Sequence, residues 1–538
     1  MASSRPLLYA RSPMRFLGLD SSTQSLTALV VDTETGEVID RSVAFGARLP
    51  QYKSPNGFLA HADPRVKHSD PLMWVEALDL ALGEIRAAGV DLSAIRGVSG
   101  AGQQHGSVYL ARPIDEAGQW STSEPLVDQV RPLLSRATAP IWMDASTGAE
   151  CAEIAAAAGG NDKMVAVTGS VAIERFTGPQ IRKFAKDDPA AYERTAEIHL
   201  VSSFVASLLT GTSVPIDFGD GAGMNLLDLA RGAWSPQLLD ATAPNLGRKL
   251  KPAVPSATYA GVVADYFVKR YGFAANTPVI AFTGDNPSSL VGMGATEPGT
   301  AVVSLGTSDT MFAAMAAPRT DPKGYGNVFG NPAGGFMALC CFSNGSLARE
   351  EVAKRCGFGW DDFARAILEQ TRPGNGGDML LPYFVPEITP RLPAPAPRWF
   401  GSADFVAGKN APAAARAVVE AQALSMRLHS AFIGQPPDRI LVTGGASKNP
   451  GILRVLADAF QAEIVPLRVS NSSALGGALR AAQAVEGQPW SDLYARFAAP
   501  DLDRRVAPDA GSKVTYEGLL KQLQQRLNDL VAETNAKR

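Results

Sequence analysis

Residues 15–32, RFLGLDSSTQSLTALVVD, decide the fold class of this chain. FLGL reads as a buried strand that ends in Asp20, SSTQS as a turn, and LTALVVD as a second strand. A buried strand delivers its terminal carboxylate rigidly, and such a carboxylate can hold Mg²⁺ directly or through water. Turn N–H groups and hydroxyls at Ser22 and Thr23 can cradle phosphate oxygens. An ordinary Ser/Thr turn without a ligand stays open as the alternative.

A second hairpin of the same kind lies far along the chain, at residues 301–315, AVVSLGTSDTMFAAM. Its turn, which contains Gly306 and Thr307, again joins two apolar strands. Residues 70–89 predict an amphipathic helix with Asp70 as its N-cap, and residues 94–102, AIRGVSGAG, a short strand running into a glycine loop. Strands that alternate with helices indicate an α/β architecture, and the repeated hairpin suggests two domains that each offer a turn to a common cleft.

A third stretch, residues 441–460, LVTGGASKNPGILRVLADAF, predicts a strand, a glycine turn and a helix. Gly444 and Gly445 would let the backbone approach a ligand, and the N-terminus of the helix would favour an anion. A βα turn that only needs positive φ stays open as the alternative. Helices are also expected over residues 413–434 and at the C-terminal end from residue 516.

Bulk properties place the chain among globular proteins of the cytoplasm. Its 538 residues are too many for a single hydrophobic core. Hydrophobic residues make up 46% of the chain and charged residues 19%, a composition that argues against disorder. The net charge of −3 gives no support for a nucleic-acid surface, and no apolar stretch approaches the ~18 residues of a membrane span. The 4 cysteines lack C-x-x-C spacing, which fits a reducing compartment. Residues 1–14 are expected to be a disordered leader rather than a transit-peptide fragment.

The order LGLDSSTQ, SLGTSDT, LVTGGASKN resembles the sugar kinase, actin and Hsp70 ATPase superfamily. The segments between them narrow the resemblance to the FGGY carbohydrate kinase family, and within it to the eukaryotic-type xylulokinases. Those segments are VSGAGQQHG (98–106), WMDAST (142–147), GSVAIERFTGPQI (169–181), PIDFGDGAGMNLLDL (215–229) and AFTGDNPSSLVGMG (281–294). The resemblance covers roughly residues 15–487.

The resemblance implies two actin-like (ribonuclease H-like) α/β domains with an active-site cleft between them. Residues 15–283 would be the N-terminal domain, which binds sugar and holds the catalytic base, residues 284–487 the nucleotide-binding domain, and residues 488–538 a helical extension. The implied reaction is phosphorylation of D-xylulose to D-xylulose 5-phosphate, with ATP and Mg²⁺. A kinase for ribulose, glycerol or a sugar acid, a non-catalytic sugar sensor and a chaperone-like or filament ATPase stay open, as does the choice between monomer and homodimer.

Residue roles carry over from the matching motifs. Asp220 matches the catalytic base, although Asp217 is close enough in sequence to be confused with it. Asp285 and Asn286 follow the strand PVIAFTG, and Asn286 is expected to cap a helix. Trp360 would bind nucleotide, with a loop packed on the core as its alternative. In full, the implied site comprises Asp20 for the metal, His105, Arg175, Asp285 and Asn286 for the sugar, and Ser22, Thr23, Gly306, Thr307, Trp360, Gly444, Gly445 and Asn449 for the nucleotide.

Overall fold

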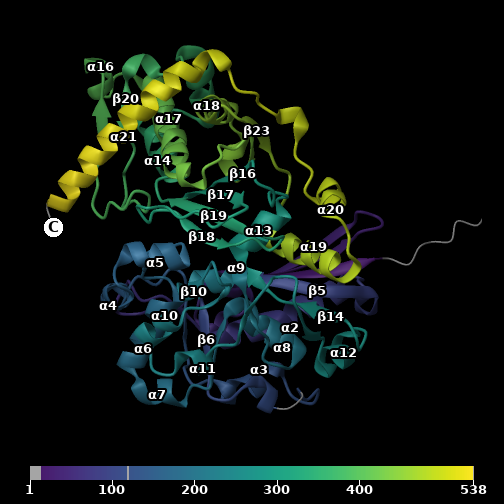
Figure 1. Cartoon of the computed structure of the whole chain (residues 1–538). Coiled ribbons are helices and arrows are strands. Elements are labelled where there is room, and N and C mark those ends of the chain that lie inside the picture. Colours follow the sequence, from purple (N-terminus) through teal and green to yellow (C-terminus); the bar gives the residue numbers. More distant parts are fainter. Residues whose placement is uncertain (1–13, 118–119, 537–538) are drawn as a thin grey trace, which may run out of the picture.

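Two mixed β-sheets organise the chain, one in each half (Figure 1). The computed structural model describes residues 14–117 and 120–536. The leader expected over residues 1–14 therefore lies outside the described part, except for Met14. None of the helices in the described part is long and apolar enough to cross a membrane.

The first sheet has the strand order β13-β14-β5-β1-β2-β3, and β15 also pairs with β5. β1 is antiparallel to β2 and parallel to β5, which confirms the hairpin expected at residues 15–32. The strands are β1 (Arg15–Ser21), β2 (Ser25–Asp32), β3 (Val38–Ala44), β5 (Ile95–Gly102), β13 (Tyr259–Val262), β14 (Pro278–Ile280) and β15 (Thr283–Gly284).

The glycine loop expected at the end of residues 94–102 is wrong, because these glycines belong to β5 itself. A Cβ atom on Gly100 would lie 2.5 Å from the ring of Phe282, and one on Gly102 would lie 2.5 Å from the Ser202 nitrogen. The glycines therefore let other elements approach the strand, and the chain turns only after them.

The second sheet has the order β18-β19-β17-β16-β22-β23. β16 is antiparallel to β17 and parallel to β22, which confirms the second hairpin. In both sheets the first strand of a hairpin lies between its antiparallel partner and a later parallel strand, so the weak sequence repeat is a structural repeat. The strands are β16 (Thr300–Leu305), β17 (Asp309–Met315), β18 (Asn327–Gly330), β19 (Phe336–Phe342), β22 (Arg439–Thr443) and β23 (Glu463–Pro466).

Helices cover both sheets, and those that the sequence predicted most clearly are confirmed. Asp70 caps α2 by accepting a hydrogen bond from the Leu72 nitrogen. In the first half lie α2 (Pro71–Ala87), α4 (Gly148–Ala158), α5 (Asn161–Thr168), α6 (Thr177–Asp187), α7 (Pro189–Arg194), α8 (Val201–Thr210), α9 (Phe218–Gly221), α10 (Pro236–Thr242), α12 (Asp265–Tyr271) and α13 (Asp285–Gly292). In the second lie α14 (Ser346–Cys356), α15 (Trp360–Arg365), α17 (Ala411–His429), α18 (Pro450–Phe460), α19 (Ser472–Glu486), α20 (Trp490–Phe497) and α21 (Lys513–Ala536).

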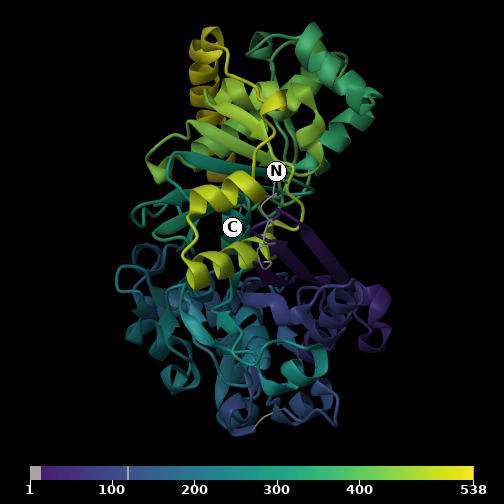
Figure 2. The same cartoon turned by 90° about the vertical axis from the view of Figure 1, so that its right-hand side faces the viewer.

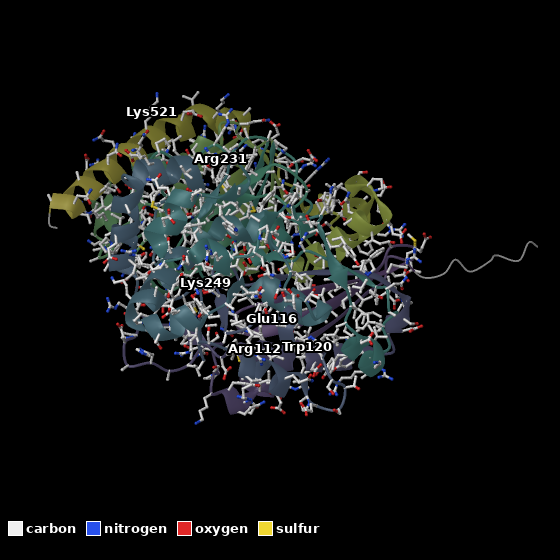
Figure 3. The ribbon with its side chains drawn as sticks, turned by 60° about the horizontal axis from the view of Figure 1, so that its bottom comes forward. Arg112, Glu116, Trp120, Arg231, Lys249 and Lys521 are labelled. Atoms are coloured by element: carbon white, nitrogen blue, oxygen red, sulfur yellow. The ribbon has the colours of Figure 1, made fainter. Side chains whose placement is uncertain are left out.

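Trp120 lies in the first half, where its indole nitrogen donates to the Leu208 carbonyl at 2.9 Å. Figure 3, in which the bottom of Figure 1 comes forward, shows Trp120 at the lower middle and Lys521 of α21 at the upper left. The α21 helix packs by Tyr516 and a row of leucines against the second core. It is therefore a packed helix of the second half.

The α19 helix crosses back to the first sheet, beside β1 and β5 (Figure 2). A Cβ atom on Gly18 would lie 1.8 Å from the Ala474 carbonyl oxygen, so the helix rests directly on the strand. Buried Arg480 donates to the carbonyls of Gly100 and Ser256, each at 3.1 Å. One face of the first sheet is therefore covered by a helix from the far end of the chain.

The two halves also touch at α9 and β18. A Cβ atom on Gly330 would lie 3.0 Å from the Gly219 nitrogen. Phe329 of β18 and Ala222, which follows α9, belong to one hydrophobic cluster. This contact sets the helix that carries Asp220 directly against the second half.

Candidate active site

The first hairpin places Asp20 at the end of β1 with one carboxylate oxygen unused. Its Oδ1 atom is buried and makes no hydrogen bond. Burial, and next the negative charge of Asp285, raise the pKa of Asp20 to about 7. A shielded carboxylate oxygen without a donor fits a cation, so this position suits Mg²⁺.

The hydroxyls of the first turn already have partners within the protein. Ser22 Oγ donates to the Ser25 carbonyl at 2.9 Å. Trp142 Nε1 donates to Thr23 Oγ1 at 2.8 Å, and Thr23 Oγ1 lies 3.4 Å from Gln103 Oε1. A phosphate bound through these hydroxyls would have to replace these hydrogen bonds.

Two aspartates compete for the role of base on α9, and the structure separates them. Asp217 is the N-cap: its Oδ1 accepts from the Asp220 nitrogen at 2.8 Å and its Oδ2 accepts from Ser256 Oγ. Asp220 Oδ2 accepts from Ser202 Oγ at 2.5 Å, while Asp220 Oδ1 is buried and has no partner. Burial raises the pKa of Asp220 well above its usual value, and the charges of Asp217 and Asp285 add to this. Both carboxylate oxygens of Asp217 therefore accept hydrogen bonds within the protein, whereas Asp220 keeps one oxygen without a partner.

His105 lies behind α9 as a neutral imidazole. Its Nδ1 lies 2.8 Å from the Gly223 carbonyl, so Nδ1 carries the proton and donates it. Burial, and next the charge of Arg175, lower the pKa of His105 to about 3. A Cβ atom on Gly223 would lie 2.9 Å from the ring, so this contact requires glycine. The guanidinium of Arg175 in turn lies 5.7 Å from the ring centre of Phe176.

Asp285 and Asn286 form one hydrogen-bonded unit with Gln104. Asp285 Oδ1 accepts from the Gln104 nitrogen at 3.3 Å and from the Asn286 nitrogen at 2.9 Å. The Asn286 amide donates to Gln104 Oε1 at 2.9 Å. Burial raises the pKa of Asp285 to about 6, against these backbone hydrogen bonds, which lower it.

The expectation that Asn286 caps this helix is wrong. The N-cap of α13 is Gly284, which has the extended φ and ψ of −71° and 156°, and Asn286 lies inside the first turn. From there its amide can reach Asp285 and Gln104 rather than the helix backbone. The side chain therefore binds Asp285 and Gln104 instead of capping the helix.

The charge of Asp285 acts on both Asp20 and Asp220, so both carboxylates lie near Asp285. Asp285 raises the pKa of both Asp20 and Asp220. Within residues 14–117 and 120–536, however, no three His, Cys, Asp or Glu side chains are arranged to hold an ion together. Mg²⁺ usually binds through one or two carboxylates plus substrate phosphates, so such a cage is not required.

The second hairpin presents Gly306 and Thr307 at an open tip. A Cβ atom on Gly306 would meet only the Ser308 carbonyl oxygen, at 3.1 Å, and Thr307 is exposed. Just behind the tip, Arg349 forms a fully buried pair with Asp309, with nitrogen–oxygen distances of 2.7 and 2.9 Å. The tip is therefore free for a ligand while its base is fixed.

A cavity of about 720 Å³ adjoins this hairpin and is lined by Trp360, Gly445 and Asn449, among others. Ser346 also lines it, and the Ser346 nitrogen donates to the Gly306 carbonyl at 2.9 Å. Trp360 is 47% exposed, so it is not part of the core. The cavity thus brings together three of the four residues outside the two hairpins that were predicted to contact the nucleotide.

Gly444, the fourth, lies behind the cavity. It has a positive φ of 91°, and a Cβ atom there would lie 2.4 Å from the Leu305 carbonyl oxygen at the end of β16. Gly444 therefore lies where the turn after β22 packs closely against the end of β16 in the second hairpin. Asn449 caps α18 through its Oδ1, and its amide donates to the Trp360 carbonyl at 3.1 Å.

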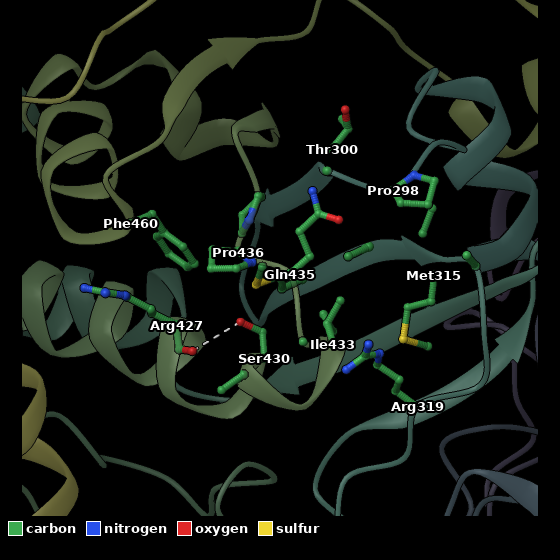
Figure 4. Close-up of a pocket in the computed structure, with 18 of the residues that line it drawn as sticks. Pro298, Thr300, Met315, Arg319, Arg427, Ser430, Ile433, Gln435, Pro436 and Phe460 are labelled. Carbon is green, nitrogen blue, oxygen red and sulfur yellow. Dashed lines mark hydrogen bonds between the residues drawn. The ribbon is translucent and has the colours of Figure 1, made fainter.

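A second cavity, of about 430 Å³, lies at the opposite ends of β16 and β17 (Figure 4). Its walls are mainly apolar, with Met315, Ile433 and Phe460 among them, and Arg319 lies at its edge. None of the residues predicted for the site lines it. The candidate active site is therefore the region of the three carboxylates and the 720 Å³ cavity.

Three polar residues near these groups escaped prediction: Gln104, Trp142 and Ser202. Gln104 and Trp142 lie inside motifs that already indicated a site, directly beside His105 and before Asp144. Ser202 has no such signal, because it follows an apolar strand in an ordinary helix start, HLVSSF. Only the fold brings it to Asp220.

The solved structures that resemble this one share a two-domain actin-like fold. The xylulose kinase from Rhodospirillum rubrum aligns with a TM-score of 0.80 and 21% identity, over 97% of this chain and 100% of that one. The gluconate kinase from Lactobacillus acidophilus aligns with a TM-score of 0.81 and 19% identity, over 98% and 100%. These neighbours confirm the fold class but not the acceptor.

The chain belongs to the FGGY family of carbohydrate kinases. The model of the family's N-terminal domain matches residues 15–292 and that of its C-terminal domain matches residues 301–485. The xylulose kinase of Rattus norvegicus is 41% identical and the alignment covers 95% of this chain and 96% of that protein. Xylulose kinase 2 of Arabidopsis thaliana is 39% identical, with coverage of 96% and 97%. The protein is thus a carbohydrate kinase, as the sequence predicted.

Proposed function

We propose that this enzyme transfers the γ-phosphoryl group of ATP to D-xylulose, giving D-xylulose 5-phosphate and ADP. Relatives named xylulose kinases, similar over nearly the whole chain, support this acceptor. The observation that carries the chemistry is the Asp220 carboxylate, buried beside Asp285 with its Oδ1 unpartnered. A second acceptor, such as gluconate, is served by the same fold in a neighbour, so the acceptor rests on the relatives.

Asp220 is the proposed general base. Its Oδ1 takes the proton of the sugar's 5-hydroxyl, and the hydroxyl oxygen forms a bond to the γ-phosphorus. The bond from the γ-phosphorus to the oxygen it shares with the β-phosphate breaks, and its electron pair leaves with ADP. Because the pKa of Asp220 is raised, its ionised form is a stronger base than an exposed aspartate would be.

His105, Arg175, Asp285 and Asn286 are the proposed sugar-reading groups. Neutral His105 has committed Nδ1 to Gly223, so the other ring nitrogen is an acceptor. Asp285 accepts and Asn286 and Arg175 donate, which suits an open-chain ketose with several hydroxyls. We assign the sugar to residues 15–283 together with the start of α13, and closure around it would align hydroxyl and phosphate.

ATP is assigned mainly to residues 284–487, with adenosine in the cavity of Trp360, Gly445 and Asn449 and phosphates at the Gly306–Thr307 tip. The Ser22–Thr23 turn of the first half would contact the phosphates from the other side. Asp20 would hold Mg²⁺, which would neutralise phosphate charge when bound. Residues 488–538 would be an accessory helical extension. The 4 free cysteines support a reducing compartment, so we place the enzyme in the cytoplasm.

Asp220→Asn tests the base. The amide fills the same volume but cannot accept the proton, so we expect kcat to fall at least about a hundredfold while sugar binding persists. Asp228→Asn, in the same stretch, is the matched control. Its Oδ1 accepts turn N–H groups, which an amide oxygen can also do, and its Oδ2 forms only a 3.5 Å pair with the exposed Arg231. ADP release and calorimetric sugar binding measure the two effects. Near wild-type turnover in Asp220→Asn would remove the base assignment.

The acceptor is tested with D-xylulose, D-ribulose, L-xylulose and glycerol, coupled to ADP detection. A missing or inverted hydroxyl leaves a buried polar group unpaired, at about 1–3 kcal/mol each, so we expect D-xylulose to lead by roughly tenfold or more in kcat/KM. Asp285→Ala should remove most of this preference together with most of the activity. If glycerol or D-ribulose gave the highest kcat/KM, the protein would still be a carbohydrate kinase, but the assignment of D-xylulose as its acceptor would be wrong.

A further inference from the structure

The carboxylate of Asp220 receives one side-chain hydrogen bond, and it comes from another helix. Ser202 Oγ, the second residue of α8, donates to Asp220 Oδ2 at 2.5 Å. Both side chains are completely buried. A hydrogen bond to a carboxylate in such a place is short and about twice as strong as one between neutral groups.

The fold brings Ser202 to this position through a glycine. The start of α8 lies against the end of β5, where a Cβ atom on Gly102 would be 2.5 Å from the Ser202 nitrogen. The N-terminal turn of α8 also carries partial positive charge, which favours a nearby carboxylate. The neighbouring Ser203 does something different, because its Oγ accepts from the Leu200 nitrogen at 3.1 Å within the same helix start.

We propose that Ser202 is a positioning residue for Asp220: its hydroxyl fixes Oδ2, so that Oδ1 is the oxygen turned to the sugar hydroxyl. This inference rests on the proposed role of Asp220 as the base. Without the bond, the carboxylate could rotate about its Cβ–Cγ bond and exchange its two oxygens. Holding one rotamer keeps the acceptor atom within reach of the proton.

Ser202 also affects the ionisation of Asp220, because a hydrogen bond to the charged form lowers the pKa of the acid. The other groups that act on this carboxyl are Asp217 and Asp285, and both raise its pKa. Asp217 lies on β9 (Ile216–Asp217), which packs on α9. The other elements that pack on α9, namely the turn Ala222–Met224, β12 (Ala253–Val254), β15 and β18, contain no ionisable side chain, nor does α8. Among the side chains that act on Asp220, loss of Ser202 therefore leaves only Asp217 and Asp285, which both favour the protonated form.

The test is the pH profile of kcat in Ser202→Ala. We expect kcat near neutral pH to fall about ten- to a hundredfold. The acid limb of the profile should move up by about one pH unit, because the base must lose its proton to act. The KM for sugar should stay within about twofold, and sugar binding with a normal melting curve shows that the variant is folded.

Two further variants separate positioning from packing. Ser202→Thr keeps the hydroxyl and should recover most of the rate and the original acid limb. Ser203→Ala removes the neighbouring hydroxyl and should lower stability without moving the acid limb. A folded Ser202→Ala with unchanged kcat and acid limb overturns the inference while Asp220→Asn still tests the base. An active Asp220→Asn overturns both.

Discussion

The two hairpins share one plan, yet they use their aspartates in opposite ways. Asp20 ends the first strand of its hairpin with Oδ1 unpartnered, and its pKa is raised to about 7. Asp309 begins the second strand of the other hairpin and is held by both Nη atoms of Arg349. One carboxylate is thus available to a cation from outside, and the other is neutralised from within.

The difference lies in a residue that is distant in sequence. Arg349 stands 40 positions after Asp309, on α14, and also donates to Gln422 Oε1 at 2.8 Å. A hydroxyl-rich turn with an acid therefore does not identify a metal site by itself. Whether such an acid is available to a metal depends on whether the fold already pairs it with a cationic side chain.

The largest expected effect comes from removing that cation. Arg349→Met leaves Asp309 buried and unpaired, so we expect unfolding to become easier by about 3–5 kcal/mol. Urea unfolding followed by fluorescence measures this. The matched control is Arg355→Met on the same helix, whose exposed pair with Glu351 should contribute about 0.5 kcal/mol or less. Equal losses in the two variants would contradict the comparison.

A smaller effect is expected at the tip of the same hairpin. Gly306→Val adds a branched side chain where only the Ser308 carbonyl now approaches, at 3.1 Å, so it would obstruct the phosphates. We expect the KM for ATP to rise about tenfold, with the KM for sugar little changed. Gly306→Ala should have a milder effect. If only the sugar constant changed, the second hairpin would belong to the other substrate.

The smallest effect concerns the first hairpin and appears as a pH dependence. Asp20 has a pKa of about 7 in the folded protein against 3.8 as its usual value, so the folded state binds more protons between these values. The contribution of Asp20 to the unfolding free energy should therefore fall as the pH rises from about 4 to about 7. Asp20→Asn should flatten this fall and raise Tm at pH 8 by roughly 2–4 °C. An unchanged pH slope in a thermal-shift series would show that Asp20 is not desolvated.

Sequence reasoning succeeded where the signal is local. Both hairpins and the helices α2, α17 and α21 follow from periodicity and, for α2, from the Asp70 cap. Asp20 could be singled out because it ends a buried strand, whereas Asp220 and Asp285 were named from their match to the motifs of the FGGY family. Asn286 was misjudged as a cap, because the residue in the capping position turned out to be Gly284.

Pairings between distant elements could not be predicted. The Ser202–Asp220 bond joins residues 18 positions apart, and the Arg349–Asp309 pair joins residues 40 positions apart. Neither pair lies within one helix turn or one strand ladder, so no period in the sequence marks it. Roles of single side chains therefore depended on resemblance, and their partners on the fold.

The position of α19 has a consequence for how the chain is made. β1 and β5 leave the ribosome long before α19 does. Gly18 therefore cannot pack against Ala474, and the Gly100 carbonyl cannot accept from Arg480, until α19 has been made. The first sheet therefore cannot be covered on this face until the chain has been synthesised beyond residue 486. Domains usually fold one after another during synthesis. In this protein the first sheet can be fully buried only after most of the second half of the chain has been synthesised. A fragment that stops at residue 292, where the first family match ends, should expose this apolar face and aggregate.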